Sequence, residues 1–297
     1  MSSVSEGCFL SSFVPSITPI PRRTTLPAGD GVRIEAVYTP CTAGSEAGGD
    51  GASGGTAVVL AHGFTGAVDR PAVRRAAGVF AQRAAVITFS FRGHGRSGGR
   101  STVGDREVLD LAAAVAWARS LGHRRIVTVG FSMGGSVVLR HAALYTAPDP
   151  RKFADERVGE RIGAHEGRTD AHTDVVVAVS APARWYYRGT APMRRLHWVV
   201  TRPAGRLVGR YGFRTRIDRE DWNPVPLSPV EAVPLITAPL LIVHGDRDPY
   251  FPLDHPRMLA GAAGGGAELW LERGMGHAEN AADEALLTRI ADWTASA

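Results

Sequence analysis

A serine flanked by two glycines stands in a mostly apolar and glycine-rich stretch of this chain. In the segment VTVGFSMGGSVVL, residues 127–139, Ser132 lies two positions after Gly130 and two positions before Gly134. A serine hydroxyl is a poor nucleophile unless a base accepts its proton and an acid orients that base. Ser132 therefore either fills a packing niche for a small side chain or is a nucleophile that a sharp turn lifts out of the core.

The neighbours of Ser132 favour a nucleophile. RIVTVGF, residues 125–131, is an apolar run typical of a buried strand, and GGSVVLRHAALY, residues 134–145, has helical spacing. The pattern Gly-x-Ser-x-Gly is weak by itself in a chain with 35 glycines. At a strand–turn–helix junction it predicts a nucleophile elbow, with a strained serine and glycines where strand and helix approach closely. The helix N-terminus at this turn favours a developing negative charge.

Candidates for the base and the acid follow two later strands. Asp246 and Asp248 come just after the apolar run PLLIVHG, residues 239–245, and His277 follows the last expected strand, in ERGMGHAEN. Serine, acid and histidine in this chain order match one of the known orders of catalytic triads. Because the carboxyl ends of parallel strands meet at one edge of a sheet, we expect these side chains to lie close to Ser132.

Short apolar runs alternate with segments of helical spacing along most of the chain. This alternation predicts right-handed crossovers and the α/β class, with a mostly parallel central sheet that helices cover on both faces. The expected strands occupy residues 56–63, 84–91, 125–131, 174–182, 239–245 and 267–272. The expected helices occupy residues 71–83, 105–122, 134–145, 253–263 and 280–296.

The alternation also divides the chain into segments. Residues 1–30 are rich in Ser, Pro and Thr and are expected to be irregular, whereas RIEAVYTP, residues 33–40, is expected to form an edge strand. Residues 31–182 and 238–297 are expected to form the two parts of one core, because strands lie on both sides of the interruption. Residues 183–237, rich in Arg, Trp, Tyr and Pro, predict an inserted cap of short helices.

Taken together, these motifs resemble the α/β-hydrolase-fold serine hydrolases, nearest to the esterase, lysophospholipase and monoacylglycerol-lipase-like branch. The segments LAHGFTG, FRGHGRSGG and HGDRDPYFP, each after an expected strand, carry the resemblance together with the serine motif. The resemblance implies an α/β-hydrolase fold with an inserted helical cap. It implies Ser132 as the nucleophile and His277 as the general base and then acid. It implies Asp248, in preference to Asp246, as the orienting carboxylate.

The resemblance implies further features of the site. The backbone N–H groups of Phe64 and Met133 are expected to form an oxyanion hole, and the expected reaction is hydrolysis of a carboxylic ester through an acyl-enzyme. Relatives often have an aspartate two residues before the arginine of the FRGHG segment, where this chain has Ser90. This departure raises the question of what supports that loop.

Other functions can use the same three side chains. A thioesterase, an acyltransferase, a perhydrolase or a peptidase is an alternative reaction, and a non-catalytic ligand-binding protein of this fold is an alternative class. Haloalkane dehalogenases and epoxide hydrolases have an aspartate at the elbow, so Ser132 argues against them. The expected cap carries residues that either line an acyl pocket or pack the cap onto the core: Trp185, Tyr186, Tyr187, His197, Trp198 and Trp222.

Composition limits the partners of the chain. It has 297 residues, 44% of them hydrophobic, and a net charge of +5 that comes from arginine, since Lys152 is its only lysine. Its arginines form no continuous basic run and no nucleic-acid motif occurs, so we expect no nucleic-acid partner. The segment PMRRLHWVV, residues 192–200, is expected to pack its apolar face onto the main domain rather than to touch lipid.

Compartment and cofactors follow from other absences in the sequence. Two cysteines, Cys8 and Cys41, are too few for a disulfide framework, and neither a signal-peptide pattern nor a bilayer-spanning apolar run occurs, so we expect a cytoplasmic protein. No metal-ligand spacing and no dinucleotide fingerprint is present, so we expect no cofactor. The expected partner is a small-molecule acyl ester, whose acyl and alcohol parts the sequence does not specify, nor does it specify the oligomeric state.

Overall fold

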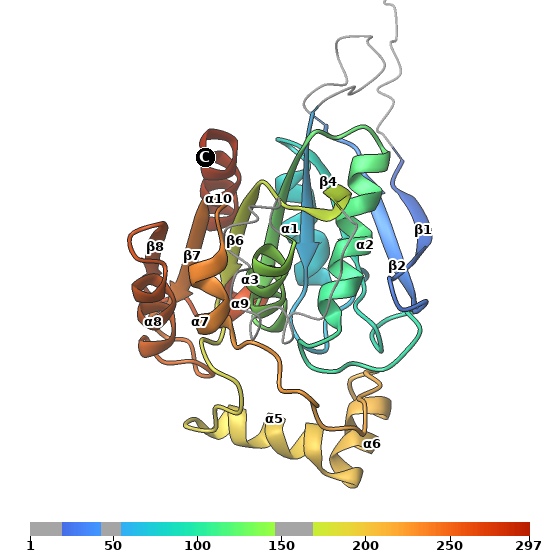
Figure 1. The fold of residues 1–297 in the computed structure, drawn as a ribbon, viewed down its shortest axis with the longest axis vertical. Coiled ribbons are helices and arrows are strands. Elements are labelled where there is room, and N and C mark those ends of the chain that lie inside the picture. Colours follow the sequence, from blue (N-terminus) through green and yellow to red (C-terminus); the bar gives the residue numbers. More distant parts are fainter. Residues whose placement is uncertain (1–19, 43–54, 146–168) are drawn as a thin grey trace, which may run out of the picture.

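The structure, a computed structural model, describes residues 20–42, 55–145 and 169–297. In this part of the chain an eight-stranded sheet runs in the order β1-β2-β4-β3-β5-β6-β7-β8 (Figure 1). The strands from β4 to β8 in this order are parallel, while β2 is antiparallel to both β1 and β4. The strands are β1 (Arg22–Pro27), β2 (Arg33–Thr39), β3 (Thr56–Ala61), β4 (Ala85–Phe89), β5 (Arg125–Phe131), β6 (Val175–Val179), β7 (Leu240–Gly245) and β8 (Ala267–Glu272).

Helices cover both faces of the sheet, as the alternation of elements predicts. On one face α2, α3 and α8 share an apolar cluster with strand residues such as Val59 and Ile87, and on the other α1 and α10 pack on residues such as Val58 and Val86. The helices of the core are α1 (Pro71–Phe80), α2 (Glu107–Ser120), α3 (Met133–Leu144), α8 (Asp254–Ala262), α9 (Ala278–Ala281) and α10 (Glu284–Ser296). The predicted α/β-hydrolase architecture of a mostly parallel, doubly covered sheet is confirmed.

Two expectations for the N-terminal part of the chain are wrong. Residues 22–27, within the segment expected to be irregular, form β1, while residues 1–19 lie outside the described residues. The strand β2 is not at the edge of the sheet, because it lies between β1 and β4. The edge strand β1 buries only Leu26 well, so its side chains show no alternation that would identify it as a strand.

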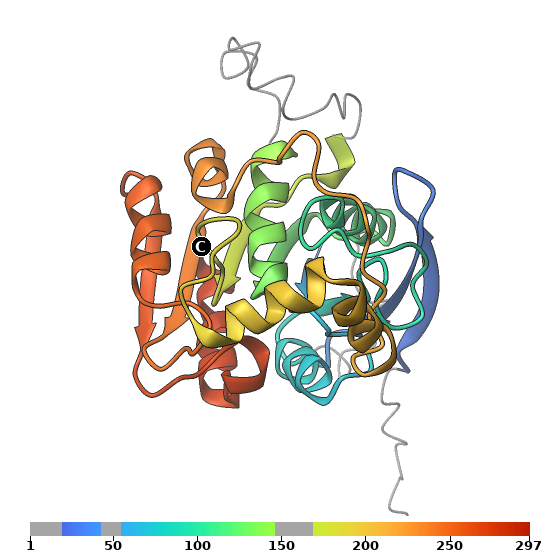
Figure 2. The same cartoon turned by 90° about the horizontal axis from the view of Figure 1, so that it is seen from below.

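The segment expected to be a cap contains two parts. The helices α5 (Ala191–Thr201) and α6 (Pro203–Tyr211) lie across the end of the molecule to which the carboxyl ends of the parallel strands point (Figure 2). The helix α7 (Pro229–Ala232) and the 3-10 turn Val233–Leu235 instead pack against α3 and α8 of the core. No helix in the described ranges has the length and apolarity that a membrane crossing requires.

The chain enters and leaves the cap at neighbouring points. Trp185 Nε1 donates to the carbonyl oxygen of Pro226 at 3.0 Å, and the amide of Val230 donates to the carbonyl oxygen of Ala183 at 3.0 Å. These two bonds hold the outgoing and returning segments side by side at the carboxyl edge of the sheet. The cap is therefore anchored directly above the loops that follow the parallel strands.

Two histidines of the core make stability depend on pH. Burial lowers the pKa of both His62 and His141 to about 3. In the unfolded chain each side chain binds a proton below its ordinary pKa of about 6.5, whereas the folded chain does not, so stability is present above that pH and falls as the pH drops toward 3. We expect the unfolding free energy to fall by about 1.4 kcal/mol per pH unit for each histidine in this window.

Urea unfolding at a series of pH values between 7.5 and 4.5 checks this expectation. The variant His141→Leu replaces one titrating side chain by an uncharged one. It should lower the slope of unfolding free energy against pH by the contribution of one histidine, about 1.4 kcal/mol per pH unit. A slope that is the same in this variant and in the parent chain would contradict the assignment.

Candidate active site

Ser132 forms the turn between β5 and α3. Its backbone has φ 52° and ψ −113°, a conformation that residues with side chains rarely adopt. Its amide donates to the carbonyl oxygen of Val179 on the neighbouring strand at 2.9 Å, and α3 begins at the next residue, Met133. The strained strand–turn–helix junction predicted for this serine is present.

Main-chain atoms on both sides of this turn leave no room for side chains. A Cβ added at Gly130 would lie 2.2 Å from the carbonyl oxygen of Gly134, and one added at Gly134 would lie 2.1 Å from the carbonyl oxygen of Ala61 in β3. Rotating a side chain cannot relieve either clash, because both obstacles are backbone. The predicted role of these two glycines, to permit the close approach of strand and helix, is confirmed.

Two hydrogen bonds connect Ser132, His277 and Asp248. His277 Nε2 lies 2.8 Å from Ser132 Oγ, and His277 Nδ1 lies 2.7 Å from Asp248 Oδ2. The Asp248 side chain is fully buried, and its Oδ1 accepts the amides of Tyr250 and Phe251 at 2.8 and 3.1 Å. The loops after β5, β7 and β8 thus bring together the serine, the second aspartate and the histidine that the sequence singled out.

The carboxylate of Asp248 determines which nitrogen of His277 carries the proton. Burial by itself raises the pKa of Asp248, but the hydrogen bond and charge interaction with His277, together with the two amides, outweigh burial and hold that pKa below its ordinary value. An ionised carboxylate only accepts hydrogen bonds, so Nδ1 donates to it and Nε2 is free to accept the proton of Ser132. In this geometry Nε2 of His277 can accept the proton of the serine hydroxyl.

The other aspartate of this loop has a different position. Asp246 Oδ1 accepts the amide of Gly274 at 2.6 Å, on the exposed side of the turn between β8 and the histidine loop. Asp246 therefore satisfies a backbone N–H group of this turn. The structure places Asp248, and not Asp246, against His277.

Aromatic rings hold the imidazole of His277 in place. The ring of Tyr250 stacks on it with 4.3 Å between centroids and 30° between planes, and the ring of Phe251 lies 5.6 Å away. Both aromatic residues follow Asp248 in the chain. The segment that supplies the carboxylate therefore also packs against the base that this carboxylate orients.

Two backbone amides beside Ser132 lack an acceptor in the described part of the chain. Met133 begins α3, whose first N–H groups have no partner within the helix. Phe64 follows Gly63, where an added Cβ would lie 3.3 Å from Ser132 Cβ, so the loop after β3 passes alongside the serine. Neither amide donates to another described residue. Their role as oxyanion donors stays a prediction that this position suits.

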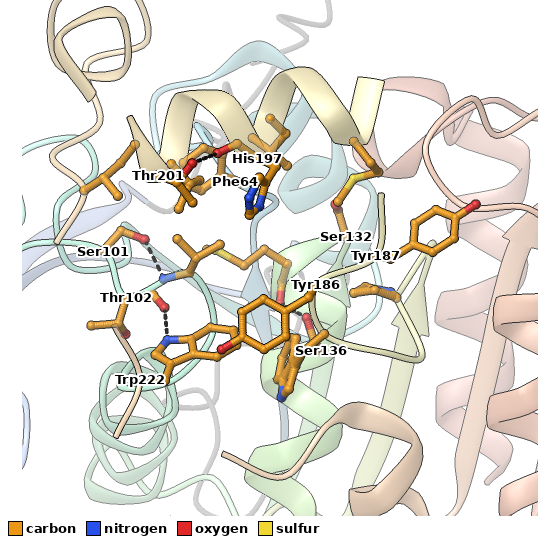
Figure 3. Close-up of a pocket in the computed structure, with 18 of the residues that line it drawn as sticks. Phe64, Ser101, Thr102, Ser132, Ser136, Tyr186, Tyr187, His197, Thr201 and Trp222 are labelled. Carbon is orange, nitrogen blue, oxygen red and sulfur yellow. Dashed lines mark hydrogen bonds between the residues drawn. The ribbon is translucent and has the colours of Figure 1, made fainter. Parts of the chain in front are cut away.

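A cavity of about 180 Å³ opens beside Ser132, between the core and the cap (Figure 3). Its lining is mostly apolar and aromatic, with contributions from Phe64 and Met133 in the core and from Leu196 in α5. The sequence did not decide whether six residues of the cap line a pocket or pack the cap onto the core. Five of them line this cavity: Trp185, Tyr186, Tyr187, His197 and Trp222.

The aromatic wall of this cavity is fixed to the core. Trp222 Nε1 donates to the carbonyl oxygen of Thr102 at 2.7 Å (Figure 3), and the rings of Trp222 and Trp185 meet edge to face with 5.1 Å between centroids. Trp198 does not line the cavity and is 46% exposed on the outer side of α5. Most of the cap's aromatic side chains therefore shape the site rather than only holding the cap down.

A carboxylate from another strand supports the loop in which this chain has Ser90 in place of the usual aspartate. Ser90 Oγ donates to Glu35 Oε2 at 3.2 Å and accepts the amide of Val68 at 3.1 Å. The same carboxylate accepts the amide of Arg96 in the FRGHGRSGG loop at 3.2 Å and forms an ion pair with Arg23. Glu35 of β2 thus provides the negative charge that position 90 lacks.

Three histidines at strand ends form hydrogen bonds with loop backbone. A ring nitrogen of His62, His94 and His244 lies 2.7, 2.9 and 2.8 Å from a main-chain carbonyl oxygen of a loop. His62 Nε2 also accepts the amide of Phe91 at 3.0 Å. Across residues 20–42, 55–145 and 169–297, no group of three or more His, Cys, Asp or Glu side chains is arranged to hold a metal ion.

One acidic residue next to this site, Glu279, was not predicted from the sequence. The Glu279 side chain is buried, and its Oε1 accepts the amide of Gly63 at 2.9 Å, although the two residues are 216 positions apart. The sequence signal is slight: a carboxylate two positions after the candidate histidine. Nothing in the residue pattern indicates that this carboxylate reaches the loop after β3.

Comparison with known proteins places the chain in a family. A family model described as the alpha/beta hydrolase family matches residues 58–288. The chain therefore belongs to the alpha/beta hydrolase family, and the protein is a hydrolase.

Individual relatives are named esterases and lipases. Esterase LipC of Mycobacterium tuberculosis is 29% identical over 158 residues, which are 51% of this chain and 34% of that protein, so the match spans about a third of the relative's length. A monoacylglycerol lipase of Mycolicibacterium smegmatis is 30% identical over 223 residues, 68% of this chain and 73% of that protein. An esterase of Pyrococcus furiosus has the same fold, with a TM-score of 0.65 at 20% identity over 94% of this chain and 93% of that one.

Proposed function

We propose that this hydrolase cleaves carboxylic esters, with Ser132 as the nucleophile, His277 as the general base and then acid, and Asp248 as the orienting carboxylate. The observation that carries the proposal is the pair of hydrogen bonds of 2.8 and 2.7 Å that runs from the serine through the imidazole to the buried carboxylate. The names of the esterase and lipase relatives support the ester as the bond that is cleaved.

The first half of the reaction forms an acyl-enzyme. Ser132 Oγ attacks the ester carbonyl carbon while His277 Nε2 takes the hydroxyl proton, and the resulting imidazolium is stabilised by Asp248. The negative charge that develops on the carbonyl oxygen is met by the amides of Phe64 and Met133, which have no other acceptor in the described residues. His277 then gives its proton to the departing alcohol, and the serine ester remains.

The second half repeats these steps with water. His277 Nε2 takes a proton from a water molecule that attacks the acyl-enzyme carbonyl, and the same two amides hold the second oxyanion. Collapse returns the proton to Ser132 Oγ and releases the carboxylic acid. Both halves use Nε2 of His277 as the proton acceptor, and the carboxylate of Asp248 fixes this tautomer by accepting the hydrogen bond from Nδ1.

The cavity indicates the kind of ester. Its volume of about 180 Å³ is smaller than the roughly 300–1,000 Å³ of sites for drug-sized ligands, and aromatic side chains of the cap close it on one side. Such a site suits an ester with one short or medium apolar chain better than a triacylglycerol. The proposed substrate is therefore a small acyl ester.

Replacing the nucleophile tests the proposal. We expect Ser132→Ala to lower hydrolysis of p-nitrophenyl butyrate by about 10⁴-fold or more, because no other group at the turn can form the acyl-enzyme. A fluorophosphonate probe should label the parent chain and not this variant. Ser136→Ala, which removes another hydroxyl of the same cavity, is the matched control and should still be labelled. Wild-type hydrolysis by Ser132→Ala would show that the nucleophile is assigned wrongly.

The two aspartates of the loop after β7 provide a second test. Asp248→Asn should lower kcat by about 10⁴-fold, because an amide at this position favours the wrong tautomer of His277. Asp246→Asn should leave kcat within a few-fold of the parent chain, because its amide oxygen can still accept the N–H of Gly274. Steady-state kinetics of both variants on the same ester decide the matter. Equal losses in the two variants would refute the assignment of the acid.

A further inference from the structure

The outer part of the cap is strongly basic. Residues 184–217 contain nine arginines and neither aspartate nor glutamate. Among the described residues only one of these arginines, Arg184, forms an ion pair, with Asp254 at 3.1 Å. The acidic residues that follow in the chain, Asp218, Glu220 and Asp221, line the cavity, and in the described part of the chain none of them forms an ion pair with these arginines. Positive charge on the outer side is therefore largely uncompensated.

Large apolar side chains are exposed on this same segment. In the described part of the chain nine large apolar side chains are exposed, and five of them lie within residues 188–214: Trp198, Leu207, Val208, Tyr211 and Phe213. On α6, Leu207 and Tyr211 are 57% and 74% exposed. Single exposed apolar residues are ordinary, but a concentration of them on one segment indicates an interaction surface.

The packing of α6 explains why these side chains point outward. Gly205 and Gly209 form its inner face, since an added Cβ would lie 2.3 Å from the carbonyl oxygen of Trp198 in the first case and 2.9 Å from Ile217 Cδ1 in the second. At about 100° per residue, Leu207 lies on the face of the helix opposite Gly205. Figure 2 shows α5 and α6 in front of the core when the molecule is viewed from this side.

We propose that this outer cap surface, the exposed side chains of residues 188–214, docks on an anionic lipid surface. Apolar side chains enter the boundary between headgroups and acyl chains while arginines meet the negative charge of the headgroups. A nucleic acid would satisfy the charge, but its contacts are mainly to phosphate and sugar, so it would bury little of the apolar surface of Leu207 and Val208. The combination of charge and exposed apolar area therefore favours lipid.

The position of α5 connects this surface to the site. Its inner face supplies Met193, Leu196 and Val200 to the cavity, as expected for the apolar face of this segment, while Trp198 is exposed on its outer side. One helix thus separates the cavity from the proposed lipid surface. From the sequence alone, lipid contact of residues 192–200 was the less favoured alternative to packing on the main domain.

Vesicle binding tests the proposal without any substrate, so its outcome is independent of the proposed reaction. The full chain should cosediment with vesicles of phosphatidylcholine and phosphatidylglycerol, more weakly with phosphatidylcholine alone, and more weakly at high salt. The double variant Leu207→Ser, Tyr211→Ser should bind these vesicles at least about tenfold more weakly than the parent chain, because it removes apolar area from the contact. Replacement of Arg202 and Arg210 by Gln should weaken binding about fivefold for each arginine.

Matched controls lie elsewhere on the surface. Leu271→Ser on β8, where the leucine is 42% exposed, and Arg257→Gln on α8 should leave vesicle binding unchanged. Hydrolysis of a water-soluble ester should be the same in the Leu207 and Tyr211 double variant as in the parent chain, since neither residue lines the cavity. Equal binding to neutral and anionic vesicles, equal loss in the controls, or tighter binding to DNA than to anionic vesicles would overturn the proposal.

A second, independent inference concerns Glu279, whose side chain is only 6% exposed. A Cβ added at Gly63 would lie 3.2 Å from both carboxylate oxygens of Glu279 and 3.3 Å from Ser132 Cβ. The carboxylate therefore lies over the Gly63 backbone next to the serine, and its Oε1 accepts the Gly63 amide at 2.9 Å. The amide one residue further along, that of Phe64, is the proposed oxyanion donor.

The segment that carries Glu279 is itself held on both sides. Arg75 Nη2 donates to the carbonyl oxygens of Glu279 and Ala282 at 2.7 and 2.9 Å, and Ser180 Oγ accepts the amide of Ala278 at 3.1 Å. His277 is two positions before Glu279. The same short, anchored segment thus positions the proposed base and reaches the proposed oxyanion loop.

We infer that Glu279 is a positioning residue, which aligns the Phe64 amide by fixing the peptide group of Gly63. This inference rests on the proposed function, since it concerns the stabilisation of an oxyanion. An acceptor at this position is sufficient for the role, and a negative charge is not required. Loss of one oxyanion donor costs about 10²–10³-fold in kcat, so loss of its alignment should cost a part of that factor.

Two substitutions of similar length separate the hydrogen bond from packing. Glu279→Gln keeps an oxygen that can accept the Gly63 amide, and kcat should stay within a few-fold of the parent value. Glu279→Met lacks a strong acceptor, and kcat should fall about 10- to 100-fold with little change in KM. Affinity for an acyl trifluoromethyl ketone, whose oxyanion occupies the same hole, should fall in parallel. Glu279→Ala repeats the test with a smaller side chain if the methionine prevents folding.

The controls distinguish failure of this inference from failure of the proposed function. Glu284→Ala, at the exposed start of α10, should change neither kcat nor inhibitor affinity. If Glu279→Met has the parent kcat, or if Gln and Met reduce kcat equally, the positioning role is wrong while ester hydrolysis stands. If the parent chain itself cleaves no ester, the proposed function fails first.

Discussion

The close approach of three main-chain segments at the start of α3 is the constraint on which the site depends. The backbones of Gly130, Gly134 and Ala61 meet there with no space for a Cβ at either glycine. The residue between the two glycines takes a positive φ, and this turn directs the hydroxyl of Ser132 into the cavity beneath the cap. His277 can reach that hydroxyl because the loop after β8 ends at the same edge of the sheet.

The central strands could be predicted from the sequence because both of their faces are buried. Every residue from Ile126 to Phe131 in β5 is buried, so the apolar signal is nearly continuous. The strand β1, RRTTLP, buries only Leu26 and is held at the sheet edge by backbone pairing with β2. Hydrogen bonds between main chains leave no pattern in the side chains, so neither β1 nor the inner position of β2 could be predicted.

The candidate site could be predicted in part for a related reason. The carboxyl ends of parallel strands share one edge of the sheet, and this predicted that Ser132, His277 and the aspartates after β7 would meet there. The choice of Asp248 over Asp246 came from the family resemblance, and the chemical roles of the three residues stay predictions. Glu35 and Glu279 could not be predicted, because each carboxylate accepts a main-chain N–H group of a distant loop. Such contacts depend on the path of the backbone and hardly at all on the type of the residue whose N–H group donates.

The hydrogen bond between Trp185 and Pro226 joins the two segments that connect the cap to the core, so the inserted segment begins and ends at nearly the same point. The entropy of closing a loop grows only slowly with its length, so a segment joined in this way can be lengthened, shortened or exchanged while the core strands keep their register. Evolution or protein engineering can therefore change the cap residues that line the cavity by altering one contiguous stretch of chain. The reaction centre below it, built on β3, β5, β7 and β8, stays as it is.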